Sequence, residues 1–176
     1  MNTNSSHYWC SGNPADRSPL RSQAGFTLIE LMLAIVIGGV LLAAAGPSFQ
    51  NMIQNNRITA QTNSFVSAMN FARSEAIKRG ANMDVIASDG TDGADEWGPG
   101  WVVAINGGDT IRIFEELDGS STLNSDNDVV SFQYGSNGRV NTADTLTLCD
   151  GRDGETGRQI TIATTGRVSS ASFDCI

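Results

Sequence analysis

The chain has a single histidine, His7, among its 176 residues, and only three cysteines, Cys10, Cys149 and Cys175. Metal centres and nucleophilic active sites are built largely from clusters of such side chains. After residue 25 the sequence contains no histidine, no phosphate-binding glycine loop and no nucleophile elbow. We therefore expect no enzymatic activity, no metal centre and no cofactor.

Positive charge is also scarce, with 11 Lys and Arg against 19 Asp and Glu and a net charge of −8. Most of the acidic residues lie between Asp84 and Asp128. This balance argues against broad electrostatic capture of nucleic acid, because phosphate binding needs clustered cations. It leaves room for a small local basic site.

Charge is almost missing from residues 28–45, where Glu30 is the only ionisable residue. A helix of about 20 residues spans about 30 Å, the hydrocarbon thickness of a bilayer. We predict a transmembrane helix over residues 26–47; the alternative is a buried helix of a soluble core. A charge at the bilayer centre costs about 2.5–3.5 kcal/mol, so Glu30 should have a partner or a task.

Arg17 and Arg21 precede the apolar run, and the next basic residue is Arg57. The positive-inside rule then places residues 1–25 in the cytoplasm and the C-terminal domain in the periplasm. An ordinary secretory signal fits less well, because the leader is long and polar and Glu30 lies inside the apolar part.

Residues 48–80 are predicted to form an amphipathic helix. One face carries Ile58, Phe65, Met69, Ala72 and Ala76, spaced by seven, four, three and four residues. Gly80 is a natural terminator. Pro47 lacks a backbone N–H and predicts a kink near the start of this helix.

Residues 81–176 are predicted to form a β-rich globular domain. Short runs rich in β-branched and aromatic residues cover 83–88, 101–105, 110–117, 129–134, 145–149, 158–163 and 167–173. Asn106-Gly107 and Asn137-Gly138 are hairpin markers. The fold class is therefore α+β, with six or seven antiparallel strands against one helix. Trp97, Trp101 and Phe114 are interpreted as core rather than as a binding surface.

Cys149 and Cys175 flank a segment rich in Gly and Asp. If this domain lies outside the cytoplasm, a disulfide between them is expected, with a stabilisation of about 3–4 kcal/mol. The alternative is two buried free thiols.

Two acidic runs carry oxygen ligands of the kind that Ca²⁺ binds. Neither has the spacing of an EF-hand, and we interpret both as solvated loops. The runs contain Asp89, Asp92, Asp95 and Glu96, and Asn124, Asp126 and Asp128.

The run Gly25-Phe26-Thr27-Leu28-Ile29-Glu30 resembles the prepilin cleavage motif of type IV pilins and type II secretion pseudopilins. The resemblance implies that a prepilin peptidase cuts between Gly25 and Phe26, that Phe26 is then N-methylated and that Cys10 leaves with the leader. It also implies that Glu30 pairs with the methylated amine of a neighbouring subunit.

Three later elements resemble the GspH/FimT group of minor pilins and pseudopilins: the helix end 71–80, Trp97-Gly98-Pro99-Gly100-Trp101-Val102-Val103 and Gly166-Arg167-Val168. The resemblance implies a type IV pilin-like fold, with a long kinked N-terminal helix packed on an antiparallel β-rich domain. It implies a structural subunit of a type IV pilus or of a type II secretion pseudopilus. Other pilins and the inner-membrane assembly platform are the implied partners, and the inner membrane followed by the filament is the implied location.

Some FimT-type proteins bind DNA for uptake through a C-terminal Gly-Arg-x-Arg loop. In this chain the fourth position is Ser169, so one of the two arginines is absent. DNA binding through Arg158 and Arg167 is therefore the alternative function, and a strand-entry turn with a solvated arginine is the competing interpretation of this loop.

Overall fold

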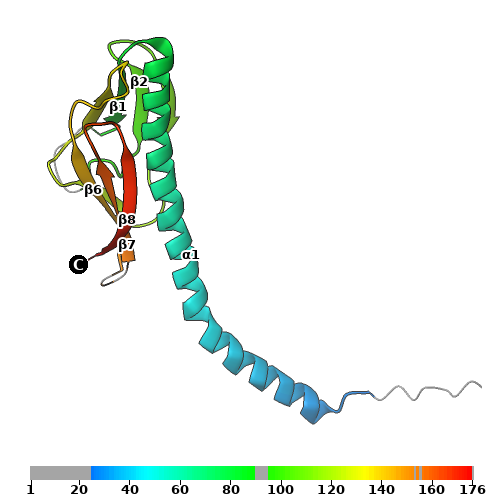
Figure 1. Ribbon diagram of the computed structural model, residues 1–176. Coiled ribbons are helices and arrows are strands. Elements are labelled where there is room, and N and C mark those ends of the chain that lie inside the picture. Colours follow the sequence, from blue (N-terminus) through cyan, green and yellow to red (C-terminus); the bar gives the residue numbers. More distant parts are fainter. Residues whose placement is uncertain (1–24, 90–94, 153, 155, 176) are drawn as a thin grey trace, which may run out of the picture. The chain divides into compact units, whose positions relative to one another are not determined.

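The computed structural model describes residues 25–89, 95–152, 154 and 156–175, and in residues 44–48 only the backbone. His7, Cys10, Arg17, Arg21 and Asp92 therefore lie outside the described residues. The chain divides into two compact units, Met1–Ala43 and Ala44–Ile176, which we describe separately. Helix α1 (Leu28–Arg79) contributes to both (Figure 1).

The described part of the first unit is the apolar start of α1. Its large apolar side chains, such as Leu33 and Val40, are more than half exposed. In the part of the chain that the structure describes, no helix is both long enough and apolar enough to cross a membrane. The predicted span 26–47 and the kink at Pro47 include residues without described side chains, and both stay predictions.

The second unit contains the predicted amphipathic part of α1. All five residues of the predicted face are at most 2 % exposed, so this prediction is confirmed. The helix ends at Arg79. The Glu75 carboxylate lies 2.6 Å from Arg79 Nε and 3.4 Å from Lys78 Nζ. Both cations lie in the last turn, where they complement the negative end of the helix dipole.

The first antiparallel sheet has the strand order β3-β2-β1-β5. Its strands are β1 (Met83–Ala87), β2 (Trp101–Ile105), β3 (Thr110–Phe114) and β5 (Ser131–Tyr134). β1 is the central strand and pairs with β2 and β5, with Val85 opposite Val103 and Phe132. All three of these side chains are buried, which places the core on this face of the sheet.

The second antiparallel sheet has the order β4-β6-β7-β8. Its strands are β4 (Thr122–Ser125), β6 (Asp144–Cys149), β7 (Thr156–Ile162) and β8 (Val168–Asp174). The register sets Leu146 opposite Ile160 and Leu148 opposite Leu123, and all four side chains are buried. β4 was not predicted. With it, the described residues form eight strands in two sheets, where six or seven strands were expected.

An aromatic cluster lies in the core between the helix and the sheets. Phe65 of α1 packs edge-on against Trp97 and Trp101, at 5.2 Å between ring centroids in both pairs. Trp97 also stacks on Phe132, and its indole N–H donates to the Val129 carbonyl at 2.8 Å. Both tryptophans are at most 1 % exposed and Phe114 is partly buried, which confirms that these aromatics belong to the core.

Candidate subunit-assembly site

The junction between Gly25 and Phe26 lies just outside helix α1, which begins at Leu28. Both residues are exposed, and the Phe26 side chain is 84 % accessible. Around Gly25 an added Cβ atom would meet no other heavy atom within 4 Å. This peptide bond is therefore outside the helical hydrogen-bond ladder.

Thr27 and Glu30 form a reciprocal capping box at the start of α1. The Glu30 N–H donates to the Thr27 hydroxyl at 3.3 Å, and the Thr27 N–H donates to Glu30 Oε2 at 3.4 Å. The first regular helical bond follows, from the Leu31 N–H to the Thr27 carbonyl at 3.1 Å. Such a box satisfies N–H groups that the first helical turn leaves free.

This second task of Glu30 was missed by sequence analysis, although Thr-x-x-Glu before an apolar run is its known signal. The box holds the carboxylate beside the helix N-terminus, close in sequence to the amine that cleavage after Gly25 would create. None of the ion pairs among the described residues includes Glu30. Its carboxylate is exposed, and in the sequence Glu30 is flanked by apolar residues.

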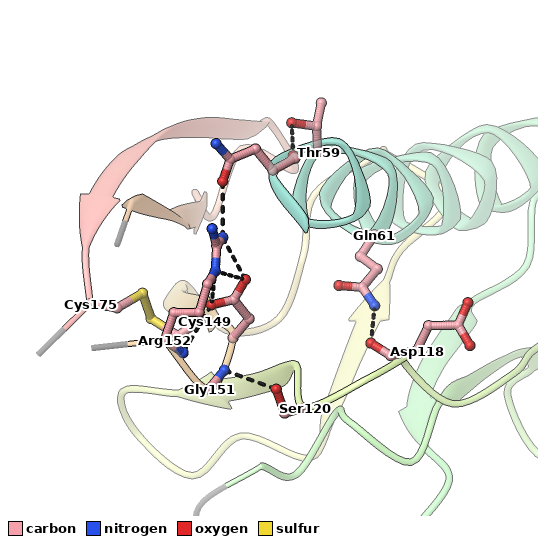
Figure 2. Close-up of polar contacts among 10 residues, drawn as sticks. Thr59, Gln61, Asp118, Ser120, Cys149, Gly151, Arg152 and Cys175 are labelled. Atoms are coloured by element: carbon pink, nitrogen blue, oxygen red, sulfur yellow. Dashed lines mark hydrogen bonds and ion pairs between the residues drawn. A yellow bond between two sulfur atoms is a disulfide. The ribbon is translucent and has the colours of Figure 1, made fainter. Parts of the chain in front are cut away.

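Cys149 and Cys175 form a disulfide, with their Cα atoms 5.9 Å apart (Figure 2). This confirms the predicted pairing and excludes two free thiols. The bridge links the end of β6 to the residue after β8, and Gly157 of β7 lies beneath it. A Cβ atom at Gly157 would lie 2.4 Å from the Cys175 sulfur and 2.3 Å from the Leu148 carbonyl oxygen, so only glycine fits.

Arg152 ties the loop after β6 to helix α1 (Figure 2). Its guanidinium donates to the Asp150 carboxylate at 2.7–3.0 Å and to Asn55 Oδ1 at 2.9 Å. The hydrogen bond from Arg152 holds the pKa of Asp150 below its ordinary value. Gln61 makes a second link from the helix, donating to the Asp118 carbonyl at 3.0 Å.

The candidate DNA contacts lie on different parts of the second sheet. Arg158 is on β7 and donates to the Ser172 hydroxyl at 3.3 Å. Arg167 is exposed in the turn between β7 and β8. The structure therefore gives Arg158 an intramolecular partner, while Arg167 extends from the turn into solvent.

Gly166 is required by the packing of this turn. Its φ is +78°, and an added Cβ atom would lie 2.1 Å from the Gly138 carbonyl oxygen. Arg73 of α1 donates to the carbonyls of Gly138 at 2.9 Å and Thr165 at 3.3 Å, which holds two turns together. The Gly-Arg element is thus a strand-entry turn with an exposed arginine, as the competing interpretation of the sequence had it; its contacts with Arg73 and Gly138 were not predicted.

The interpretation of both acidic runs as solvated loops is wrong for Asp95 and Glu96, which bind the protein's own backbone; Glu96 is buried. Asp95 Oδ1 accepts the Leu123 N–H at 2.7 Å, and Glu96 Oε2 accepts the Ser125 N–H at 3.0 Å. Burial raises the pKa of Asp95. Among the described residues, no group of three or more acidic, histidine or cysteine side chains could hold a metal ion.

Three features together define a pilin-like protein. They are the exposed Gly-Phe junction, the glutamate in a capping box, and the long helix that continues into a unit with two antiparallel sheets. The chain belongs to the family described as type II transport protein GspH, which matches residues 61–166. Residues 20–46 match the prokaryotic N-terminal methylation motif. Both recognitions made from the sequence are confirmed.

Two curated proteins, each named fimbrial protein, from Pseudomonas aeruginosa are similar to the chain. Each is 41 % identical over 61 residues, which is 35 % of this chain and 39 % of the relative. The chain therefore spans about two fifths of the length of these relatives.

Crystal structures of the type IV minor pilin FimU of Pseudomonas aeruginosa share the fold. In two crystal forms the TM-scores are 0.57 and 0.54, with 20 % identity. The matches cover 66 % and 64 % of this chain and 89 % and 91 % of the FimU chains. The pilin-like α+β architecture is thereby confirmed.

Membership of this family makes the chain a minor pilin or pseudopilin, a structural subunit and not an enzyme. The family implies assembly with other pilins and processing by a prepilin peptidase. The methylation motif implies anchoring in the inner membrane, followed by incorporation into a filament.

Proposed function

We propose that this chain is a minor pilin of a type IV pilus, with the H-type pseudopilin of type II secretion as the alternative. The named relatives support this choice, because the curated matches are fimbrial proteins and the similar structures are of a type IV minor pilin. Deleting the gene should remove or reduce pili and leave type II secretion intact. Loss of secretion with normal pili would overturn the choice of filament.

The leader is removed between Gly25 and Phe26, and the new amine of Phe26 is methylated. The observation that supports this is the exposed, non-helical junction immediately before the capped helix start. The N-terminal segment would stay in the cytoplasm until cleavage, with the domain after Gly46 in the periplasm.

Glu30 joins neighbouring subunits by pairing with the methylated amine of the adjacent chain. A buried carboxylate and ammonium offset each other's desolvation, whereas either alone is costly. The capping box supports this role, because it holds the carboxylate in place before a partner arrives. On docking, the amine competes with the Thr27 N–H for the same oxygens.

The test compares Glu30→Ala and Glu30→Gln with the wild-type chain in a strain lacking the gene. Removing one partner of a buried ion pair costs about 3–5 kcal/mol, so both variants should be largely absent from sheared pili. The prepilin peptidase should still cleave both of them. Leu33→Ala is the matched control, because it alters the same helix without removing a charge. Normal incorporation of both Glu30 variants would refute the pairing.

DNA uptake remains the alternative function that the sequence raised. Arg158 donates to Ser172, so Arg167 is the main candidate contact for DNA phosphates. The turn lacks the second arginine of the Gly-Arg-x-Arg motif, because Ser169 stands at that position. Each absent phosphate contact lowers the salt-dependence slope by about 0.7–0.9 and weakens binding. We expect no gel retardation at low salt; retardation that Arg167→Ala abolishes would favour DNA binding instead.

A further inference from the structure

The second sheet has one face toward the core and an outer face on the opposite side. Along β4, β6 and β7, buried leucines and isoleucines alternate with the residues of the outer face, and the register extends that face to β8. The outer face comprises every second residue of 122–124, 145–149, 157–161 and 169–173. None of these residues is charged, although the chain has a net charge of −8. Its hydrogen-bonding side chains are therefore all neutral.

Phe173 of β8 is the large apolar side chain on the outer face. It is half-buried, and the other aromatic residues of the described strands all belong to the core or pack against it. Phe173 lies opposite Gly157 of β7, beneath the Cys149–Cys175 disulfide. The sheet thus holds an aromatic ring outside the core, where a ligand can contact it.

A hollow of about 280 Å³ lies on the outer face next to this ring. It is lined by Phe173 of β8, Thr147 and Cys149 of β6, and Thr122 and Asn124 of β4. The register sets Thr122 opposite Cys149 and Asn124 opposite Thr147, so strand pairing fixes the positions of four of these residues. The volume is just below the range of about 300–1,000 Å³ of small-molecule sites, which suits a single small ring.

The polar side chains of the hollow have free hydrogen-bonding groups. Asn124 Oδ1 accepts the Asp95 N–H at 3.1 Å, which orients the amide and leaves its Nδ2 group as a donor. The hydroxyls of Thr122 and Thr147 make no hydrogen bond to another described residue. The nearby Asp95 carboxylate accepts the Leu123 N–H at 2.7 Å and is not part of the lining.

We propose that this hollow binds one ring of a neutral carbohydrate. A sugar ring presents C–H groups on its faces and hydroxyls around its edge, and these hydroxyls both donate and accept hydrogen bonds. Phe173 supplies an apolar surface for the C–H groups. Thr122 and Thr147 supply groups that donate and accept, and Asn124 supplies a donor. The inference goes beyond filament assembly and does not depend on which filament the chain joins.

The chemistry of the lining selects this class of ligand. An anionic polymer needs cationic contacts, and none of the lining residues is basic. A cation would need carboxylates, and none of the lining residues is acidic. A purely apolar ligand would leave the two hydroxyls and the amide without partners, which costs free energy. A neutral ligand rich in hydroxyls satisfies these groups and the ring together.

A hollow of this size contacts little of a ligand, so binding of one sugar is weak. A polysaccharide offers many equivalent rings, and rebinding raises the effective concentration, which makes a weak contact measurable. The test is native electrophoresis of the full-length chain in mild detergent, through gels that contain a polysaccharide. The neutral probes are dextran, soluble starch, galactomannan and hydroxyethyl cellulose, and polygalacturonate is the anionic probe. We expect retardation by at least one neutral probe and none by polygalacturonate.

Two variants test the groups that the proposal uses. Phe173→Ala removes the ring and should weaken the apparent affinity about tenfold. Thr147→Val keeps the shape of the side chain but removes the hydroxyl, and should weaken it about fivefold. Thr161→Val is the matched control, because Thr161 is exposed on the same face but does not line the hollow. Fluorescence of the buried tryptophans checks that each variant remains folded.

Retardation that Phe173→Ala and Thr147→Val weaken and Thr161→Val preserves would support the proposal. It would be overturned by three results: no retardation of the wild-type chain by any neutral probe, retardation by polygalacturonate alone, or equal losses in Thr147→Val and Thr161→Val. A neighbouring subunit is the other candidate occupant of the hollow. Loss of Phe173→Ala from sheared pili, without sugar binding by the wild-type chain, would assign the hollow to that subunit and refute the carbohydrate site.

Discussion

The two units of this chain treat apolar side chains in opposite ways. In residues 28–43 nearly every large apolar side chain is exposed, whereas in the second unit Phe65, Met69 and Leu146 are completely buried. The second unit therefore contains its own core. The apolar surface of the first unit is covered only when another phase or another molecule surrounds it. The second unit thus folds around its own core, whereas the first unit exposes apolar surface that assembly would cover.

The largest expected effect comes from Phe65→Ala, which empties the centre of the aromatic cluster. Truncating a buried Phe costs about 3–5 kcal/mol of unfolding free energy. Urea unfolding followed by the fluorescence of Trp97 and Trp101 measures this loss. Leu33→Ala, in the exposed apolar helix, should leave the urea midpoint unchanged. A similar loss in both variants would break the distinction between the two units.

The disulfide should contribute the next largest effect. Replacing Cys149 and Cys175 by serine opens a loop with a sequence separation of 26 residues. Chain entropy predicts a loss of about 3–4 kcal/mol. The same urea titration, with and without reducing agent, measures it. If the urea midpoints of the double variant and of the reduced wild-type chain differ widely, the serine hydroxyls rather than the lost bridge cause the change in stability.

Thr27→Val should act on the first unit alone. Loss of an N-cap hydroxyl costs about 1 kcal/mol of local helix stability. Amide exchange of residues 28–31 should accelerate, while the urea midpoint of the second unit stays constant. Thr27→Ser retains the hydroxyl and is the control. Unchanged exchange in Thr27→Val would show that the capping box contributes nothing in solution.

The smallest expected effect is the loss, at acidic pH, of the stability that the Asp150–Arg152 pair contributes. Because Arg152 lowers the pKa of folded Asp150, the pair stabilises the fold above the unfolded pKa of about 3.9. This contribution disappears as the pH falls from there through the folded pKa. Asp150→Asn should therefore lower the urea midpoint at neutral pH and match the wild-type chain at low pH. A difference that stays constant with pH would contradict this assignment.

Sequence patterns predicted the local features well. The helix face from Ile58 to Ala76 follows from its period, and most strands follow from β-branched runs between turn residues. The disulfide could be predicted because Cys149 and Cys175 are the only two cysteines after residue 25. Each of these signals lies within a few neighbouring residues or in the residue type itself.

The features that were missed depend on contacts between distant segments. β4 has the sequence TLNS, which has little strand signal, and it forms because β6 pairs with one side while Asp95 and Glu96 hold the other. The division into two sheets and the link from Arg152 to Asn55 are likewise long-range. The capping box is the exception, because its four-residue signal was visible in the sequence.

The bond between Cys149 and Cys175 also determines how the domain responds to force. An antiparallel hairpin pulled at its free end opens like a zipper, one pair after another. Here the residue after β8 is covalently joined to β6, so tension at that end passes into the middle of the sheet. Peeling β8 away from that end must then also disturb the pairs that β6 makes with β4 and β7.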